Sequence, residues 1–170
     1  MAHCRWFLGF LGLLWLNAGL TASLQADITG APAGYRLGLV AEDCDSDVCN
    51  GPFTAVVQRP DQPVAQYLPW QTEADALAVA QLQTKPYGSQ SYLVVRDVDF
   101  DGQPDVMVYE GNSGPYSGPT YAVYLYSPRR QAFVLNEPLT ELARTGLGLF
   151  AVDDARHELT GADRVVVARD

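Results

Sequence analysis

A stretch of nine residues near the middle of the chain contains four aspartates at a spacing typical of metal binding. Residues 97–105 read D-V-D-F-D-G-Q-P-D, with carboxylates at alternate positions before a glycine and one more three residues after it. Alternate residues of a curled loop point to one side, and calcium takes oxygen ligands at about 2.3–2.6 Å. Gly102 occupies the sixth position, where such loops turn most sharply. The predicted calcium ligands are the carboxylates of Asp97, Asp99, Asp101 and Asp105 and the backbone carbonyl of Gln103.

The acidic loop joins two strand-like segments. Residues 91–96 and 105–109 are rich in β-branched and aromatic side chains, as strands are. An EF-hand loop supplies a glutamate at its twelfth position, on a following helix, whereas this chain has Val108 there. We therefore expect the metal to stabilise a hairpin and not to open a pair of helices. The alternative interpretation is a solvated acidic turn between two strands.

The first 26 residues predict export. Arg5 precedes an apolar run over residues 6–16, and small residues follow, as in a secretory signal peptide cleaved after Ala22, Ser23 or Ala26. The apolar run is shorter than the roughly 20 residues that a membrane span needs. The expected organisation is a signal peptide over 1–26 and a single calcium-loop domain over 27–170, located in the periplasm or secreted, without a membrane span.

The charge balance of the exported part limits its partners. Loss of Arg5 leaves ten of the eleven Lys and Arg residues against twenty Asp and Glu, a net charge of about −10. Such a surface repels nucleic acid and anionic membranes, and it attracts cationic proteins. The sequence therefore predicts a protein partner and no nucleic acid.

Two cysteines remain after export. Cys44 and Cys49 lie close together in a chain that is destined for an oxidising compartment, which predicts a small disulfide loop. Two free or otherwise paired thiols are the alternative. A zinc site is disfavoured because a tight site needs four nitrogen or sulfur ligands, and His157 is the one histidine after the signal peptide.

Short strands separated by turn residues recur along the chain and predict a mostly β domain of antiparallel hairpins. Residues 73–83 favour a helix by propensity, although their Ala-Leu-Ala-Val-Ala centre could also form a strand. Residues 137–142 predict a short helical turn, so one or two short helices are expected at most. The expected strands span 35–40, 53–58, 64–68, 91–96, 105–109, 121–126, 131–135, 147–152 and 164–167.

The sequence does not predict an enzyme. A nucleophilic triad requires a histidine near a serine or cysteine, and His157 lies in a charged turn where a solvated side chain is expected. No phosphate-binding loop, dinucleotide fingerprint or H-E-x-x-H motif occurs in the chain.

Seven segments in order carry a family resemblance: residues 86–91, the acidic loop, 111–121, 123–126, 133–134, 139–142 and 148–153. Together they resemble exported bacterial single-domain proteins related to the FG-GAP and VCBS calcium-loop repeats, some of which are periplasmic lysozyme inhibitors. The resemblance spans residues 86–159 and implies a β-rich, half-propeller-like fold whose metal holds one hairpin. Proteins of this group continue with another strand pair, so a shortened domain is one expectation for a chain that stops at Asp170.

The resemblance also implies a binding loop. Lysozyme inhibitors of several kinds present an S-G-x-Y type motif to the sugar-binding cleft, and residues 113–116 have that spacing. The implied function is a calcium-stabilised inhibitor of a cationic lysozyme. The alternatives are a plain strand connector over 111–120, and an envelope adhesion or assembly module with no enzyme target. The residues expected to contact the partner are Ser113, Gly114, Tyr116 and Tyr121.

Overall fold

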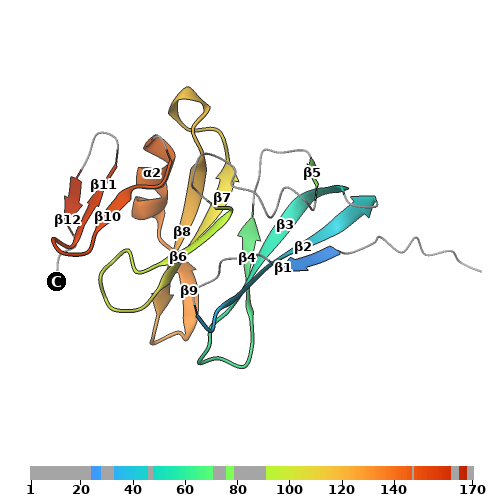
Figure 1. The fold of residues 1–170 in the computed structure, drawn as a ribbon, viewed down its shortest axis with the longest axis horizontal. Helices are drawn as coiled ribbons and strands as arrows, with labels where there is room; N and C mark the ends of the chain where they lie inside the picture. Colours follow the sequence, from blue (N-terminus) through green and yellow to red (C-terminus); the bar gives the residue numbers. More distant parts are fainter. Residues whose placement is uncertain are drawn as a thin grey trace, which may run out of the picture.

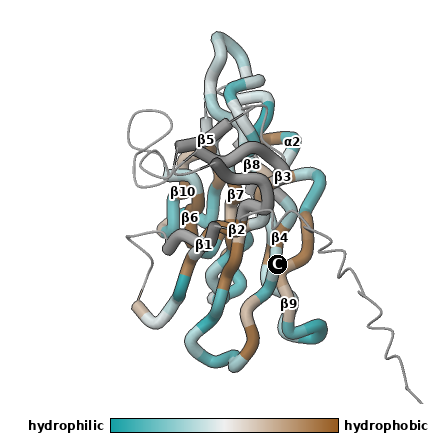
Figure 2. The backbone as a smooth tube through the Cα atoms, turned by 90° about the vertical axis from the view of Figure 1, so that its right-hand side faces the viewer, coloured by the Kyte–Doolittle hydropathy of each residue, from teal (hydrophilic) through white to brown (hydrophobic). Residues whose placement is uncertain are grey.

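The structure is a computed structural model that describes residues 24–27, 33–45, 48–70, 76–78, 91–146, 148–161 and 165–167. These residues form three antiparallel sheets that follow one another along the chain, with a short helix after the second sheet (Figure 1). The predicted mostly β class with few short helices is therefore confirmed. Figure 2 shows hydrophobic residues along the strands and hydrophilic residues in most of the turns.

The N-terminal sheet is built on a long hairpin. Its strands run in the order β1-β2-β3-β4, with β5 paired to the far end of β3. Alternate residues of the central strands, such as Leu39, Phe53 and Val57, are buried on one face, which is the period-two burial expected of a sheet with one solvated side. The strands are β1 (Leu24–Asp27), β2 (Arg36–Asp45), β3 (Val48–Gln58), β4 (Gln66–Trp70) and β5 (Ala76–Ala78).

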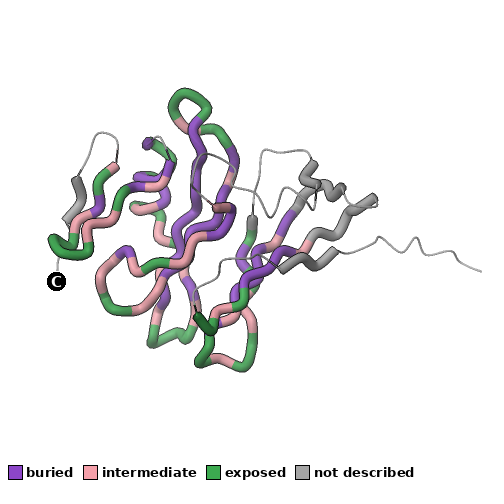
Figure 3. Tube along the Cα trace, viewed as in Figure 1, coloured by how far each residue is buried: buried purple, intermediate pink, exposed green. Residues whose placement is uncertain are grey.

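The central sheet carries the acidic loop and the loop between β7 and β8. Its order is β6-β7-β8-β9, and β7 and β8 pair in register from Val106↔Tyr124 to Tyr109↔Tyr121 before the register shifts at Gly111. Nearly all of β7 is buried, so both faces of this strand are covered (Figure 3). The strands are β6 (Leu93–Arg96), β7 (Asp105–Gly111), β8 (Thr120–Ser127) and β9 (Ala132–Leu135).

Helix α2 (Glu137–Thr145) packs on β8 just beyond the end of β9. The Asn136 side chain caps it by accepting from the Leu139 N–H at 3.0 Å, as a helix N-cap does. The helix then replaces a strand as partner of Val123. The Val123 carbonyl accepts from the Asn136 N–H at 2.8 Å, and the Val123 N–H donates to Thr140 Oγ1 at 2.9 Å.

The C-terminal sheet has the order β10-β11-β12, with β10 (Ala151–Asp153), β11 (Glu158–Thr160) and β12 (Val165–Val167). Arg96 of β6 connects it to the central sheet, since its Nη2 donates to the Val152 carbonyl at 3.2 Å and pairs with Asp154 at 2.9 Å.

Gln66 and Arg59 are among the side chains that join the N-terminal sheet to the central sheet. The Gln66 amide pairs with the backbone of Phe133 in both directions, at 2.7 and 2.6 Å, and so acts as a short extension of the β9 edge. Arg59 is 8% exposed, pairs with Asp61 at 2.9 Å and places its guanidinium 3.7 Å from the centre of the Tyr126 ring. Desolvated cation–π contacts of this kind contribute about 2 kcal/mol.

The helix predicted over 73–83 is wrong at its centre, where Ala76–Ala78 form β5. Pairing with the Val48–Asn50 end of β3 outweighs the helix propensity of alanine and leucine, because propensity differences amount to only tenths of a kcal/mol per residue. The remainder of that segment lies outside the described residues. The strand predicted over 147–152 begins only at Ala151, and β11 was missed.

Cys44 and Cys49 are Cα partners across β2 and β3. Directly opposed strand positions have the Cα separation that a disulfide requires. Their side chains lie outside the described part of the chain, so the disulfide stays a prediction.

Most of the predicted signal peptide lies outside the described residues, but Leu24–Asp27 pair with β2. Cleavage after Ala22 or Ser23 would retain this strand. Among the described residues, no helix is long and apolar enough to cross a membrane.

We expect Thr140→Val to lower the free energy of unfolding by about 1–3 kcal/mol, because it leaves the buried Val123 N–H without its acceptor. Thr145→Val in the same helix is the control, since the Thr145 hydroxyl is exposed and bonds only helix carbonyls. Urea unfolding of both variants measures the difference. Equal stability of the two variants would contradict the assigned role of Thr140.

Candidate functional site

Three of the predicted metal ligands converge in the acidic loop. Carboxylate oxygens of Asp97, Asp99 and Asp105 all lie within 4.8 Å of one another. Oxygens on opposite sides of a calcium ion are about 4.6–5.2 Å apart, twice the calcium–oxygen distance. The spacing and the hard oxygen donors therefore fit calcium.

The backbone of the loop is shaped by Asp97 and Gly102. Asp97 Oδ1 accepts from the Phe100 N–H at 2.7 Å, and Oδ2 accepts from the Gly102 N–H at 2.8 Å. Gly102 has φ of +83°, and a Cβ placed there would meet nothing within 4 Å. Its conformation, and not lack of space, is what favours glycine at this position. The predicted sharp turn at the sixth loop position is confirmed.

Asp105 is the buried member of the cluster, with 0% exposure. Its Oδ2 accepts from the Val98 N–H at 2.9 Å and its Oδ1 from the Tyr126 N–H at 2.8 Å. Burial raises the pKa of Asp105 to about 7, while the two backbone N–H groups act in the opposite direction. A carboxylate has about four acceptor positions, so both oxygens keep capacity for a cation.

Asp101 and Gln103 differ from the other predicted ligands. The exposed Asp101 carboxylate accepts from the Gln103 N–H at 2.7 Å and lies outside the converging triad. The predicted ligand atom of Gln103 is its backbone carbonyl oxygen, and its side-chain oxygen accepts from Arg59 Nη2 at 3.1 Å. Burial, then the charges of Asp101 and Asp97, raise the pKa of Asp99, which shows the electrostatic cost that a cation would remove.

Two contacts tie the acidic loop to the neighbouring sheets. Phe100 stacks on His157 of the β10–β11 turn, with ring centres 5.0 Å apart and planes at 14°. His157 is exposed, as predicted, but it also packs on the loop. Gln103 reaches the N-terminal sheet through Arg59. Sequence reasoning missed Arg59 because its contacts with Gln103 and Tyr126 join segments that lie far apart in the chain.

The loop between β7 and β8 is held in a defined shape at its base and at its turn. Thr120 Oγ1 donates to the Gly111 carbonyl at 3.1 Å, so the Ser113 hydroxyl, 3.3 Å away, is the donor of the second contact. The Gly118 N–H donates to the Pro115 carbonyl at 2.9 Å, and the Gly114 N–H to the Gly118 carbonyl at 3.1 Å.

Tyr116 lies at the tip of this loop, inside the short 3₁₀ turn η1 (Pro115–Ser117), and is 94% exposed. Tyr116 and Ser117 have φ of +53° and +58°, a left-handed conformation that is uncommon for residues with a side chain. Figure 1 shows the loop projecting from the end of the central sheet opposite the acidic loop. An exposed aromatic residue is thus displayed in a strained but hydrogen-bonded turn.

The predicted partner-binding residues divide into two groups. Tyr116 and Ser113 are exposed and Gly114 is partly exposed, so these residues are accessible to a partner. The prediction for Tyr121 is wrong, because its side chain is 0% exposed and its hydroxyl donates to the Ser91 carbonyl at 2.9 Å. Tyr121 lies opposite Tyr109 of β7, and the two rings pack edge-on against each other.

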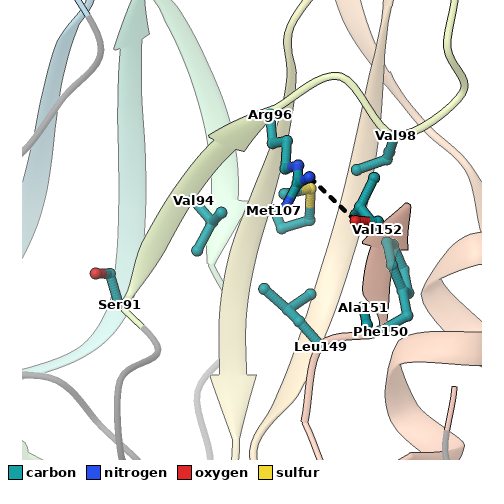
Figure 4. Close-up of a pocket in the computed structure, with 9 residues that line it drawn as sticks. All are labelled: Ser91, Val94, Arg96, Val98, Met107, Leu149, Phe150, Ala151 and Val152. Atoms are coloured by element: carbon teal, nitrogen blue, oxygen red, sulfur yellow. Dashed lines mark hydrogen bonds between the residues drawn. The ribbon is translucent and has the colours of Figure 1, made fainter. Parts of the chain in front are cut away.

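A hollow of about 430 Å³ lies between β6, β7 and the segment before β10 (Figure 4). Its walls are mostly aliphatic, and its polar lining is Ser91 and Arg96, whose guanidinium already donates to the Val152 carbonyl. The hollow is a seam between two sheets and brings no reactive pair of side chains together.

No family model matches the sequence, and no curated protein matches it. A solved structure of a Xanthomonas type IV secretion system related protein is similar, with a TM-score of 0.59 and 25% sequence identity. The similarity covers 84% of this chain and 69% of that chain, which shows that the two proteins share most of one fold.

We expect Asp105→Asn to destabilise the protein even in EGTA, by about 1–3 kcal/mol, because the amide has one acceptor oxygen for two buried backbone N–H donors. Asp101→Asn is the matched control, since Asp101 is exposed and lies outside the triad, and it should leave metal-free stability within about 0.5 kcal/mol. Thermal unfolding in EGTA compares the two. Equal melting temperatures would show that Asp105 serves the metal alone.

Proposed function

We propose that this protein is an exported, calcium-stabilised binding protein that engages a cationic protein, specifically a lysozyme, through the exposed part of the loop between β7 and β8 (residues 111–120), which we call the Tyr116 loop. The observation that carries the proposal is the 94% exposed side chain of Tyr116 at the tip of a projecting loop whose backbone is closed by hydrogen bonds. Tyrosine is among the residues that dominate binding energy at protein interfaces.

The loop geometry supports a binding role over that of a plain connector. A connector gains nothing from a left-handed tyrosine, which costs of order 1 kcal/mol, whereas a binding loop gains from entering the complex already ordered. The loop is narrow and projects, so it suits a concave partner surface such as a sugar-binding cleft. The Tyr116 hydroxyl could donate to a catalytic carboxylate there without adding negative charge, whereas the Ser113 hydroxyl already donates to Thr120.

The acidic loop supplies the stability that such a role needs. Asp97, Asp99 and Asp105 would hold the calcium directly, and Asp101 and the Gln103 carbonyl would complete the site. A bound divalent cation neutralises the clustered carboxylates. Because this loop and the Tyr116 loop lie at opposite ends of β7, we assign the metal a structural role.

The charge of the whole chain supports a cationic partner. The formal net charge is −9, so electrostatic steering would speed association with a basic lysozyme. The fold shared with a Xanthomonas type IV secretion system related protein supports a location in the cell envelope. It also favours the second candidate function, a calcium-binding envelope assembly module whose Tyr116 loop binds another envelope protein.

Tyr116→Ala is expected to weaken inhibition of a susceptible c-type or i-type lysozyme about 30-fold, since truncation of an interface hot spot costs at least 2 kcal/mol. Tyr67→Ala, which removes a tyrosine that is 64% exposed on the N-terminal sheet, should change inhibition less than about twofold. A turbidity assay on bacterial cell walls gives both values. If the wild-type protein slows neither lysozyme class at micromolar excess, the lysozyme proposal is wrong. The envelope assembly module is then the favoured function.

Calcium is expected to raise the melting temperature, because a ligand that binds only the folded state stabilises it by about 2.7 kcal/mol at 100 times its dissociation constant. Differential scanning calorimetry in excess calcium and in excess EGTA measures the shift. Asp99→Asn should reduce the shift by removing one member of the triad. An identical melting temperature in the two buffers would contradict a calcium site.

A further inference from the structure

We propose that Glu110 and Arg144 are positioning residues that hold the Tyr116 loop against the C-terminal end of α2. This inference rests on the proposed binding role of the loop and explains what fixes the orientation of the loop relative to the domain. Neither residue belongs to the S-G-x-Y type motif, and they are separated by more than thirty positions in the sequence.

Glu110 and Arg144 form a bidentate ion pair. Arg144 Nε donates to Glu110 Oε2 at 2.9 Å, and Arg144 Nη2 donates to Glu110 Oε1 at 2.7 Å. Parallel hydrogen bonds of this kind restrict orientation as well as distance, which a single surface contact does not do. Glu110 lies mostly shielded from solvent, and the bond to Glu110 is the main cause of the raised pKa of Arg144.

The position of the pair in the fold is what gives it this role. Glu110 lies within the register shift between Tyr109 and Gly111, where β7 leaves regular pairing and the loop begins. Arg144 lies in the last turn of α2. The ion pair therefore joins the root of the loop to the end of the helix.

The loop touches the helix end a second time, two residues after Arg144. A Cβ on Gly114 would lie 3.3 Å from the Gly146 carbonyl oxygen and 2.9 Å from the Gly118 carbonyl oxygen. Gly114 is thus packed against two backbone segments. One is Gly146, the C-cap of α2, and the other is Gly118, on the part of the loop that leads into β8. Figure 1 shows α2 beside the root of the loop.

Among the described residues, the other hydrogen bonds of the loop do not fix its angle to the domain. The Thr120 and Ser113 hydroxyls close the base, and the two backbone bonds close the turn, but all of these lie within residues 111–120. The Glu110–Arg144 pair and the Gly114–Gly146 contact connect this unit to α2. Without them, the closed loop could pivot at its root, and an ordering cost would be added to binding.

The test measures loop order and binding separately in the full exported chain. Backbone ¹⁵N relaxation should give order parameters near 0.85 for Gly114, Tyr116 and Gly118 in the wild type, falling below about 0.6 in Glu110→Gln and Arg144→Gln. The Val123 amide, on β8, should stay rigid in all variants. Asp154→Asn breaks the ion pair between Arg96 and Asp154 and is the control, with no change expected at the loop.

Inhibition of lysozyme by the same two variants should weaken about tenfold, with the melting temperature close to that of the control. Arg144→Lys keeps the charge without the bidentate geometry and should also loosen the loop, which provides a milder variant if a glutamine variant fails to fold. Unchanged order parameters at the loop in the folded variants would overturn the positioning role. If the wild type binds no lysozyme, the proposed function fails while the relaxation data still decide the role of Glu110 and Arg144.

Discussion

The structure depends on a buried carboxylate at the start of β7. Asp105 is fully enclosed, and burying a charge is costly unless its oxygens are bonded. One oxygen takes the Val98 N–H and so curls the acidic loop, while the other takes the Tyr126 N–H and holds β8 beside it. Tyr126 in turn lies under the Arg59 guanidinium, which brings in the N-terminal sheet. Asp105 is thus a candidate metal ligand and also the residue that ties the acidic loop to β8.

The central hairpin separates two tasks in space. At one end, backbone N–H donors or a bound cation must offset the repulsion between the clustered carboxylates. At the other end, a tyrosine is displayed in a turn whose own hydrogen bonds offset its backbone strain. The rigid, doubly covered β7 between them means that a metal at the first end can stiffen the platform of the second without touching it. This division suits a binding protein whose contact loop must be ordered before it meets a partner.

Sequence reasoning succeeded where the determining interactions are local. The strands around the acidic loop, the turn at Gly102 and the short helix after Asn136 all follow from neighbours within a few residues. It failed where pairing between distant segments decided the outcome. Ala76–Ala78 became a strand because an edge of β3 was open to them, and Tyr121 became core because β7 lies opposite it.

The chemistry of the acidic loop was therefore determined by the sequence itself, because carboxylates at alternate positions around a left-handed glycine need no distant partner to converge. Which of them converge was decided by the tertiary structure. Asp105 is drawn inward by the N–H of β8, whereas Asp101 stays in solvent. The orientation of the Tyr116 loop was likewise decided by the fold, since Glu110 and Arg144 meet only when α2 docks on β8. Local spacing determines which side chains are available in each loop. Long-range packing determines which of these side chains lie close together.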